Sequence, residues 1–209
     1  MPLFLNHRVL FLHIPKCGGD TFSHALSRAD DPPLFFVPDG SVLVNGHTPQ
    51  HMTWREWCSV GWSRQTGFRV MAFVRHPVDR VMSAYRYVHL ARPDLVHLAE
   101  TPSAFLDHFF SPDPAVRLRF DHHNLGMLDF LRNEEGEVDP AIELWHISEM
   151  DEALSTLGLP AIAPSERRNV TVQDDGFTAR DLERVRLHIA DDLAWYEERF
   201  GAYPSSDSA

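Results

Sequence analysis

Short apolar runs separated by polar turns punctuate the chain, and they predict its strands. The clearest runs cover residues 8–14, 68–74 and 143–147, with weaker candidates at residues 34–37 and 42–44. Runs that are this short and this continuously apolar are typical of strands buried on both faces, as in a parallel sheet.

Helical patterns follow the apolar runs. The expected helices cover residues 22–28, 53–62, 77–90, 102–110, 124–131, 149–157 and 177–200. Asp20 or Thr21 can cap the first of these helices, and Thr53 can cap the second. Pro77 suits the first turn of the third helix, and apolar side chains recur at helical spacing along the last one.

This order of elements predicts an α/β fold, a three-layer sandwich with a mainly parallel central sheet that resembles P-loop nucleotide-binding folds. We expect residues 1–203 to form one domain and residues 204–209 to be a flexible tail. Ligands of such folds bind at the carboxyl ends of strands. Because Lys16, His47 and Arg75 each follow a strand candidate, we expect them to share one site.

Composition narrows the possible functions. The chain has 209 residues, 44% of them hydrophobic, which suits one compact domain. A net charge of −11 disfavours a protein that binds nucleic acid. The two cysteines suggest neither a disulfide framework nor a zinc pattern, no apolar run reaches the length of a membrane span, and no signal peptide is evident. We therefore expect a cytoplasmic protein.

Residues 15–21, which we name the phosphate loop, have the parts of an anion site. The backbone at Gly18 and Gly19 can approach a phosphate closely where a helix begins. Lys16 adds a full charge, and it is the only lysine among the 19 basic residues. The alternative is a plain turn with a solvated lysine. Since Lys16 precedes the glycines, the loop is not a Walker A motif, and a nucleotide kinase is disfavoured.

Residues 11–22, Phe-Leu-His-Ile-Pro-Lys-Cys-Gly-Gly-Asp-Thr-Phe, resemble the 5′-phosphosulfate loop of the sulfotransferase family that includes heparan and chondroitin sulfotransferases. Members typically read F-x-H-I-P-K-T/S-G-G-T-T/S. The chain departs from this pattern at Cys17 and Asp20, where hydroxyl residues are common in the family. The resemblance implies that the sulfuryl donor 3′-phosphoadenylyl sulfate contacts Lys16, Cys17, Gly18, Gly19, Asp20 and Thr21.

Residues 70–85 resemble the 3′-phosphate element of the same family, a hydrophobic strand followed by R-x-P and a serine eight residues after the arginine. Arg75 can grip a phosphate with two N–H groups, and Ser83 can add a hydroxyl. The alternative is a structural Arg75 paired with Asp79. Asn169 lies in a basic segment that resembles a further loop near the nucleotide.

The resemblance implies in-line transfer of a sulfuryl group to a hydroxyl of a carbohydrate or small-molecule acceptor, with Lys16 stabilising the leaving phosphate. A neutral histidine is the natural proton acceptor. His47 follows Gly46 as in a G-H motif that carries the proposed base in several members, so we expect it to be the base. His51 is a reserve candidate, and His13 is expected to pack in the core.

We expect no metal. His122 and His123 stand beside Asp121, but adjacent side chains rarely reach one ion, and the spacing reveals no third ligand. We therefore expect His122 and His123 to lie at the surface or in the acceptor cleft. The competing function is a catalytically silent nucleotide-binding protein of the same fold.

Overall fold

A four-stranded sheet in the order β1-β2-β3-β4 forms the centre of the computed structural model, which describes residues 1–37, 43, 47–61, 67–163 and 175–201. The strands are β1 (Leu3–Phe4), β2 (Val9–Leu12), β3 (Arg69–Val74) and β4 (Ile142–His146). β1 is antiparallel to β2, whereas β2, β3 and β4 are mutually parallel. The predicted α/β fold with a mainly parallel sheet is confirmed.

Strand register brings the carboxyl ends of the parallel strands to one edge of the sheet. Phe11 stands opposite Met71, and Met71 stands opposite Glu143. The three clearest apolar runs of the sequence all form strands, while the two-residue β1 is too short to leave a pattern. Of the weaker candidates, Leu34 makes only an isolated bridge to Leu3, and residues 42 and 44 lie outside the described residues.

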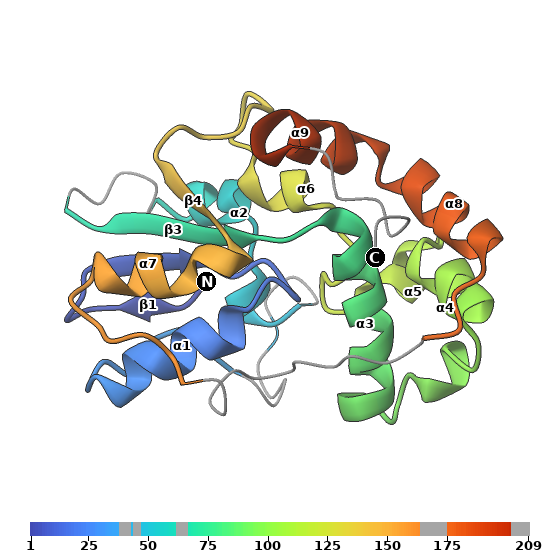
Figure 1. Cartoon of the computed structure of the whole chain (residues 1–209), viewed down its shortest axis with the longest axis horizontal. Helices are drawn as coiled ribbons and strands as arrows, with labels where there is room; N and C mark the ends of the chain where they lie inside the picture. Colours follow the sequence, from blue (N-terminus) through green and yellow to red (C-terminus); the bar gives the residue numbers. More distant parts are fainter. Residues whose placement is uncertain (38–42, 44–46, 62–66, 164–174, 202–209) are drawn as a thin grey trace.

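Helices flank the sheet and extend beyond it (Figure 1). They are α1 (Gly19–Arg28), α2 (Trp54–Ser59), α3 (Pro77–Ala91), α4 (Pro102–Phe109), α5 (Pro114–Leu118), α6 (Met127–Leu131), α7 (Met150–Ser155), α8 (Ala179–His188) and α9 (Ala190–Phe200), with short 3-10 turns η1 (Pro49–His51), η2 (Val96–Leu98) and η3 (Ile147–Glu149). In Figure 1, α1 lies on one side of the strands and α2 with α6 on the other. Among the described residues, no helix has the length and apolar character needed to cross a membrane.

The helix starts agree only partly with the predicted caps. Thr53 caps α2, and its capping box with Glu56 is complete. α1 begins earlier than expected, at Gly19, after Gly18 with a φ of 86°. Gly18 can take this left-handed conformation without a Cβ clash, so the predicted cap Asp20 instead lies inside the first turn.

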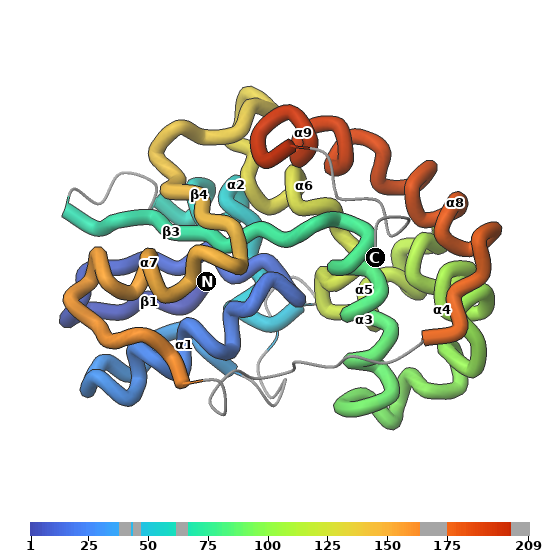
Figure 2. The backbone as a smooth tube through the Cα atoms, viewed as in Figure 1, coloured from blue at the N-terminus to red at the C-terminus, as the bar shows by residue number. Residues whose placement is uncertain are grey.

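The final helix is broken where one continuous helix was predicted. α8 ends at His188 and α9 begins at Ala190. The bend lets α8 pack on α3 and α4 while α9 turns back toward α6 (Figure 2). Asp192 holds this turn, because its carboxylate accepts hydrogen bonds from the backbone N–H groups of Met127 (2.6 Å) and Leu128 (3.0 Å).

Two hydrophobic clusters divide the interior. One joins the sheet to α1, α2, α6 and α7, with Phe22 packed on Phe11 and Phe73. The other joins α3, α4 and α8 through side chains such as Phe105 and Val185. α3 starts only three residues after β3 ends, so it carries the chain from the first cluster directly into the second.

Arg80 on α3 links the two clusters by hydrogen bonds. Its guanidinium, 3% exposed, donates to the backbone carbonyls of Pro15 (3.0 Å), Leu125 (2.7 Å) and His123 (3.1 Å). Carbonyl groups buried in this way would lose their donors if the side chain were shortened or made apolar. Arg80 therefore fixes the phosphate loop against the segment before α6.

Replacing Arg80 with methionine should lower the free energy of unfolding by about 3 kcal/mol or more, because buried carbonyls lose charged donors. Urea denaturation followed by circular dichroism would measure the change. Arg184→Met, which removes an arginine paired with the exposed Asp107, should cost at most about 1 kcal/mol. Equal losses in the two variants would contradict the structural role given to Arg80.

Candidate functional site

The phosphate loop connects β2 to α1 in a tight turn. Lys16 has a φ of 69°, and a Cβ added to Gly18 would lie 2.7 Å from the Met150 side chain. A Cβ on Gly19 would lie 2.3 Å from the ring of His13. Within the described part of the chain, the N–H groups of these two glycines make no hydrogen bond, and they stand at the amino end of α1. Such an end is suited to an anion.

Lys16 is largely enclosed by protein. Its Nζ lies 4.0 Å from the centroid of the Tyr87 ring, a cation–π contact. Burial lowers the pKa of Lys16 to about 8; the carboxylate of Asp20 opposes this shift, and the positive charge of Arg75 adds to it. The ammonium therefore lacks a full complement of anionic partners in the free protein, and an anion bound beside it would stabilise its charge.

Arg75 emerges at the end of β3, next to the phosphate loop. The backbone of Arg75 makes a hydrogen bond to the thiol of Cys17, so the two loops are in contact. Among the described residues, the Arg75 guanidinium makes no side-chain hydrogen bond or ion pair, and no pair with Asp79 is seen. The structure thus brings Lys16 and Arg75 to the same edge of the sheet, as the sequence predicts.

The other residues predicted to contact the nucleotide differ in how far they are buried. Ser83 lies on α3 and Thr21 on α1, 7% and 5% exposed respectively. The side chain of Cys17 is buried, and burial raises the pKa of its thiol to about 11, so this loop position can offer a ligand only its backbone. Asp20 is half-buried near Lys16 and would repel an anion in part. Asn169 lies outside the described residues.

His47 does not have the geometry expected of a base. Its ring is 1% exposed, Nδ1 lies 3.0 Å from the Thr48 carbonyl and Nε2 lies 3.0 Å from Oε1 of Glu56. Burial alone would lower the pKa of His47, but the hydrogen bonds to Glu56 and Thr48 raise it above the ordinary value. Both ring nitrogens of His47 therefore face fixed partners, and neither faces Lys16 or Arg75 through any contact in the described residues.

His51 fits the role of a base better. Its Nδ1 lies 2.8 Å from Oδ2 of Asp121, while its Nε2 makes no hydrogen bond within the described residues. Burial opposes the ionisation of Asp121, but hydrogen bonds from His51 and Thr48 lower the pKa of this carboxyl to about 2. The carboxylate thus holds the proton on Nδ1 and leaves Nε2 as the acceptor.

A chain of rings connects His51 with Lys16. His51 meets the edge of His123 at 5.1 Å between centroids, and His123 stacks on Tyr87 at 4.9 Å. Tyr87 in turn faces the ammonium of Lys16. His51 also contacts His13, which packs beside Gly19 and is buried in the core as predicted.

Sequence reasoning missed Tyr87 and Asp121 as members of this site. No motif marks them, because they reach it only through the packing of α3 and of the segment before α6. His123, which was predicted to lie at the surface or in an acceptor cleft, is only 8% exposed and packs between Tyr87 and His51.

Lys16 should titrate with a pKa near 8 in the ligand-free protein, because burial destabilises its ammonium. The chain has one lysine, so protein grown with ¹³Cε-lysine gives one side-chain NMR signal to follow against pH. Asp20→Asn should lower this pKa further, since it removes the carboxylate that raises it. Asp191→Asn, at an exposed position of α9, is the control that should leave the pKa of Lys16 unchanged. A midpoint near the ordinary value of 10.5 would show that Lys16 is solvated.

Comparison with known proteins identifies a family for this chain. The model of a family described as the sulfotransferase family matches residues 4–109, about half of the chain, including β2, the phosphate loop, β3 and α3. Neither the curated proteins nor the solved structures searched gave a match. The matched segment contains both Lys16 and Arg75. The chain belongs to the sulfotransferase family, whose members are transferases of the sulfuryl group.

Proposed function

We propose that this protein transfers a sulfuryl group from 3′-phosphoadenylyl sulfate to a hydroxyl of a carbohydrate or small-molecule acceptor. The observation that carries the proposal is the meeting of Lys16 and Arg75 at the ends of two adjacent parallel strands. Lys16 would contact the 5′-phosphosulfate together with the N–H groups of Gly18 and Gly19. Arg75, with Ser83, would contact the 3′-phosphate.

In the proposed reaction the acceptor oxygen forms a bond to sulfur while the bond from sulfur to the bridging phosphate oxygen breaks. Adenosine 3′,5′-bisphosphate leaves, and Lys16 stabilises the charge that develops on its 5′-phosphate. The proton of the acceptor hydroxyl passes to a histidine. We assign that histidine as His51, held by Asp121, in place of the expected His47, whose ring nitrogens are both occupied.

The nature of the acceptor rests on chemistry more than on contacts. A chain with a net charge of −11 is poorly suited to a strongly anionic polymer, so we favour a neutral sugar or a small metabolite with a hydroxyl group. A cytoplasmic location and the part of Asn169 in nucleotide binding also stay predictions.

The alternative, a silent nucleotide-binding protein, is favoured by one observation. Asp20 places a carboxylate in the phosphate loop, where it is close enough to raise the pKa of Lys16. Transfer of radiolabelled sulfate, tested with a panel of hydroxyl acceptors, distinguishes the two. Nucleotide binding without transfer to any acceptor would support the silent protein.

Adenosine 3′,5′-bisphosphate should bind the wild-type chain, and Lys16→Ala or Arg75→Ala should weaken binding about 10- to 100-fold, because each removes a charged hydrogen-bond donor. Isothermal titration calorimetry would measure the affinities. Arg184→Ala removes a half-buried arginine on α8, far from the sheet edge, and should bind as the wild type does. If the wild type does not bind this nucleotide, the proposed donor is wrong.

His51→Ala should lower sulfate transfer about 100-fold or more while leaving bisphosphate affinity within about threefold, since a base acts on the acceptor. His47→Ala should lower transfer less, because its ring makes no contact with the cation pair. Initial rates and binding measured on the same preparations test both. A reversed order of the two variants would restore His47 as the base.

A further inference from the structure

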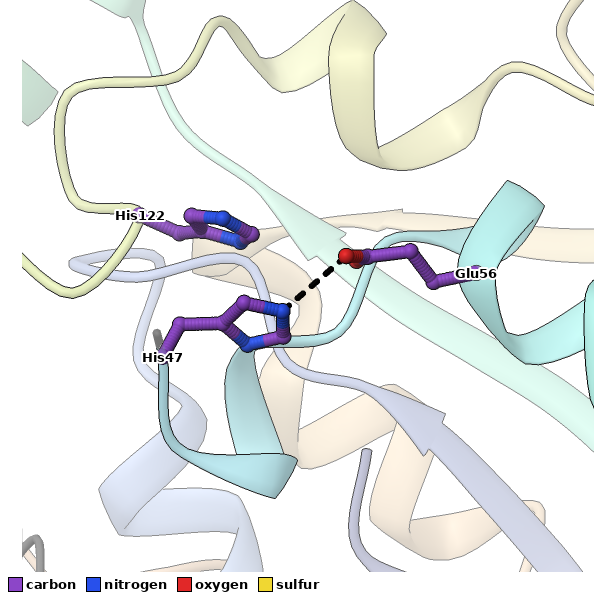
Figure 3. A group of neighbouring side chains, drawn as sticks. All are labelled: His47, Glu56 and His122. Carbon is purple, nitrogen blue, oxygen red and sulfur yellow. Dashed lines mark hydrogen bonds and ion pairs between the residues drawn. The ribbon is translucent and has the colours of Figure 1, made fainter. Parts of the chain in front are cut away.

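A group of side chains apart from the nucleotide residues has the composition of a metal site. His47, from the segment before η1, lies beside Glu56 on α2 and His122 from the segment before α6 (Figure 3). Their nearest ligand atoms all lie within 4.8 Å of one another. Two donors that are each about 2 Å from one ion lie at most about 4 Å apart, so little movement is needed for all three to reach a common ion.

Hydrogen bonds orient all three side chains. Nδ1 of His47 lies 3.0 Å from the Thr48 carbonyl, and Nδ1 of His122 lies 3.1 Å from the His51 carbonyl. A carbonyl oxygen can only accept, so both rings carry their hydrogen on Nδ1 and present Nε2. Histidines that bind a metal through one ring nitrogen commonly donate the N–H of the other to a backbone carbonyl.

Glu56 is held with one oxygen committed and the other available. Oε2 accepts hydrogen bonds from the backbone N–H (2.7 Å) and the hydroxyl (2.9 Å) of Thr53. Oε1 faces Nε2 of His47 at 3.0 Å. The capping box of α2 thus turns one carboxylate oxygen toward the two rings.

The stacking of the two rings brings their edges to the same side. Their centroids are 3.8 Å apart at an interplanar angle of 28°, and Figure 3 shows the carboxylate of Glu56 approaching that side. His47 is buried, whereas Glu56 and His122 are half-buried, so a water molecule can complete the coordination.

We propose that Nε2 of His47, Nε2 of His122 and Oε1 of Glu56 bind one divalent transition-metal ion of the zinc type. Two imidazoles and one carboxylate suit such an ion better than magnesium or calcium, which prefer oxygen ligands. The ion joins the segment containing η1 and α2 to the segment that carries Asp121. This proposal departs from the expectation of no metal. It does not depend on the proposed reaction, because neither Lys16 nor Arg75 takes part.

The neighbouring group of His51, Asp121 and His123 is the competing location. His51 commits Nδ1 to Asp121, and His123 uses its ring face to stack on Tyr87. Within the described residues, neither His51 nor His123 makes a hydrogen bond from Nδ1 to a backbone carbonyl. Their ring nitrogens are therefore not oriented as those of His47 and His122 are.

Zinc titration of the metal-stripped full-length chain tests the site. We expect one Zn²⁺ per chain with a Kd of about 1 μM or tighter, measured by calorimetry or by competition with a coloured chelator. His122→Ala should weaken binding at least about 100-fold, because loss of a direct ligand costs no less than loss of its hydrogen-bond partner. Glu56→Gln keeps an acceptor for Thr53, and with it the cap of α2, so it tests the ligand without unfolding the helix. We expect this variant to bind zinc about tenfold more weakly or worse.

His123→Ala is the matched control, since it removes the adjacent histidine from the competing group. It should bind zinc within about threefold of the wild-type affinity. The proposal is overturned if the wild type binds no tighter than about 100 μM, if Glu56→Gln binds as the wild type does, or if His123→Ala loses the ion while His122→Ala retains it. If His122→Ala does not fold, the Glu56→Gln result decides.

Discussion

The buried guanidinium of Arg80 connects parts of the molecule that must stay in register for a site to exist. It reaches the phosphate loop at Pro15 and the segment before α6 at Leu125 and His123. Parallel pairing of β2 with β3 aligns the loops that follow these two strands. Strand pairing does not, however, hold α3 and the segment before α6 against those loops. Because Arg80 lies in the first turns of α3, directly after β3, one side chain couples the sheet edge, α3 and the histidine-rich segment.

Positive charge at the sheet edge contrasts with the acidic character of the whole chain. Lys16 and Arg75 belong to a protein whose net charge is −11, so the attraction for an anion is local. The face of Tyr87 stabilises a compact ammonium that is otherwise poorly solvated. Asp20 moderates the same charge, which makes this phosphate loop less positive than one with a hydroxyl residue there.

The adjacent residues His122 and His123 pack against different side chains because of the backbone conformation at this turn. Asp121 and His122 both adopt left-handed conformations, with φ of 49° and 62°. This turn directs His122 toward His47 and Glu56, and His123 toward His51 and Tyr87. Sequence reasoning was right that the two side chains do not meet at one point. Side chains from distant parts of the chain pack against each of them, and spacing along the chain cannot reveal these contacts.

The sequence by itself determined the parallel strands, most helices, the strand-to-helix turn at residues 15–21, and the position of Lys16 and Arg75 at one edge of the sheet. These follow from local signals: apolar runs, caps, glycines beside a lysine, and polar residues directly after strands. Only the tertiary structure decided the break between α8 and α9, the occupied nitrogens of His47 and the pairing of His51 with Asp121. Each of these depends on contacts between residues far apart in the chain, and a histidine shows its chemical role only once the partners of both ring nitrogens are known.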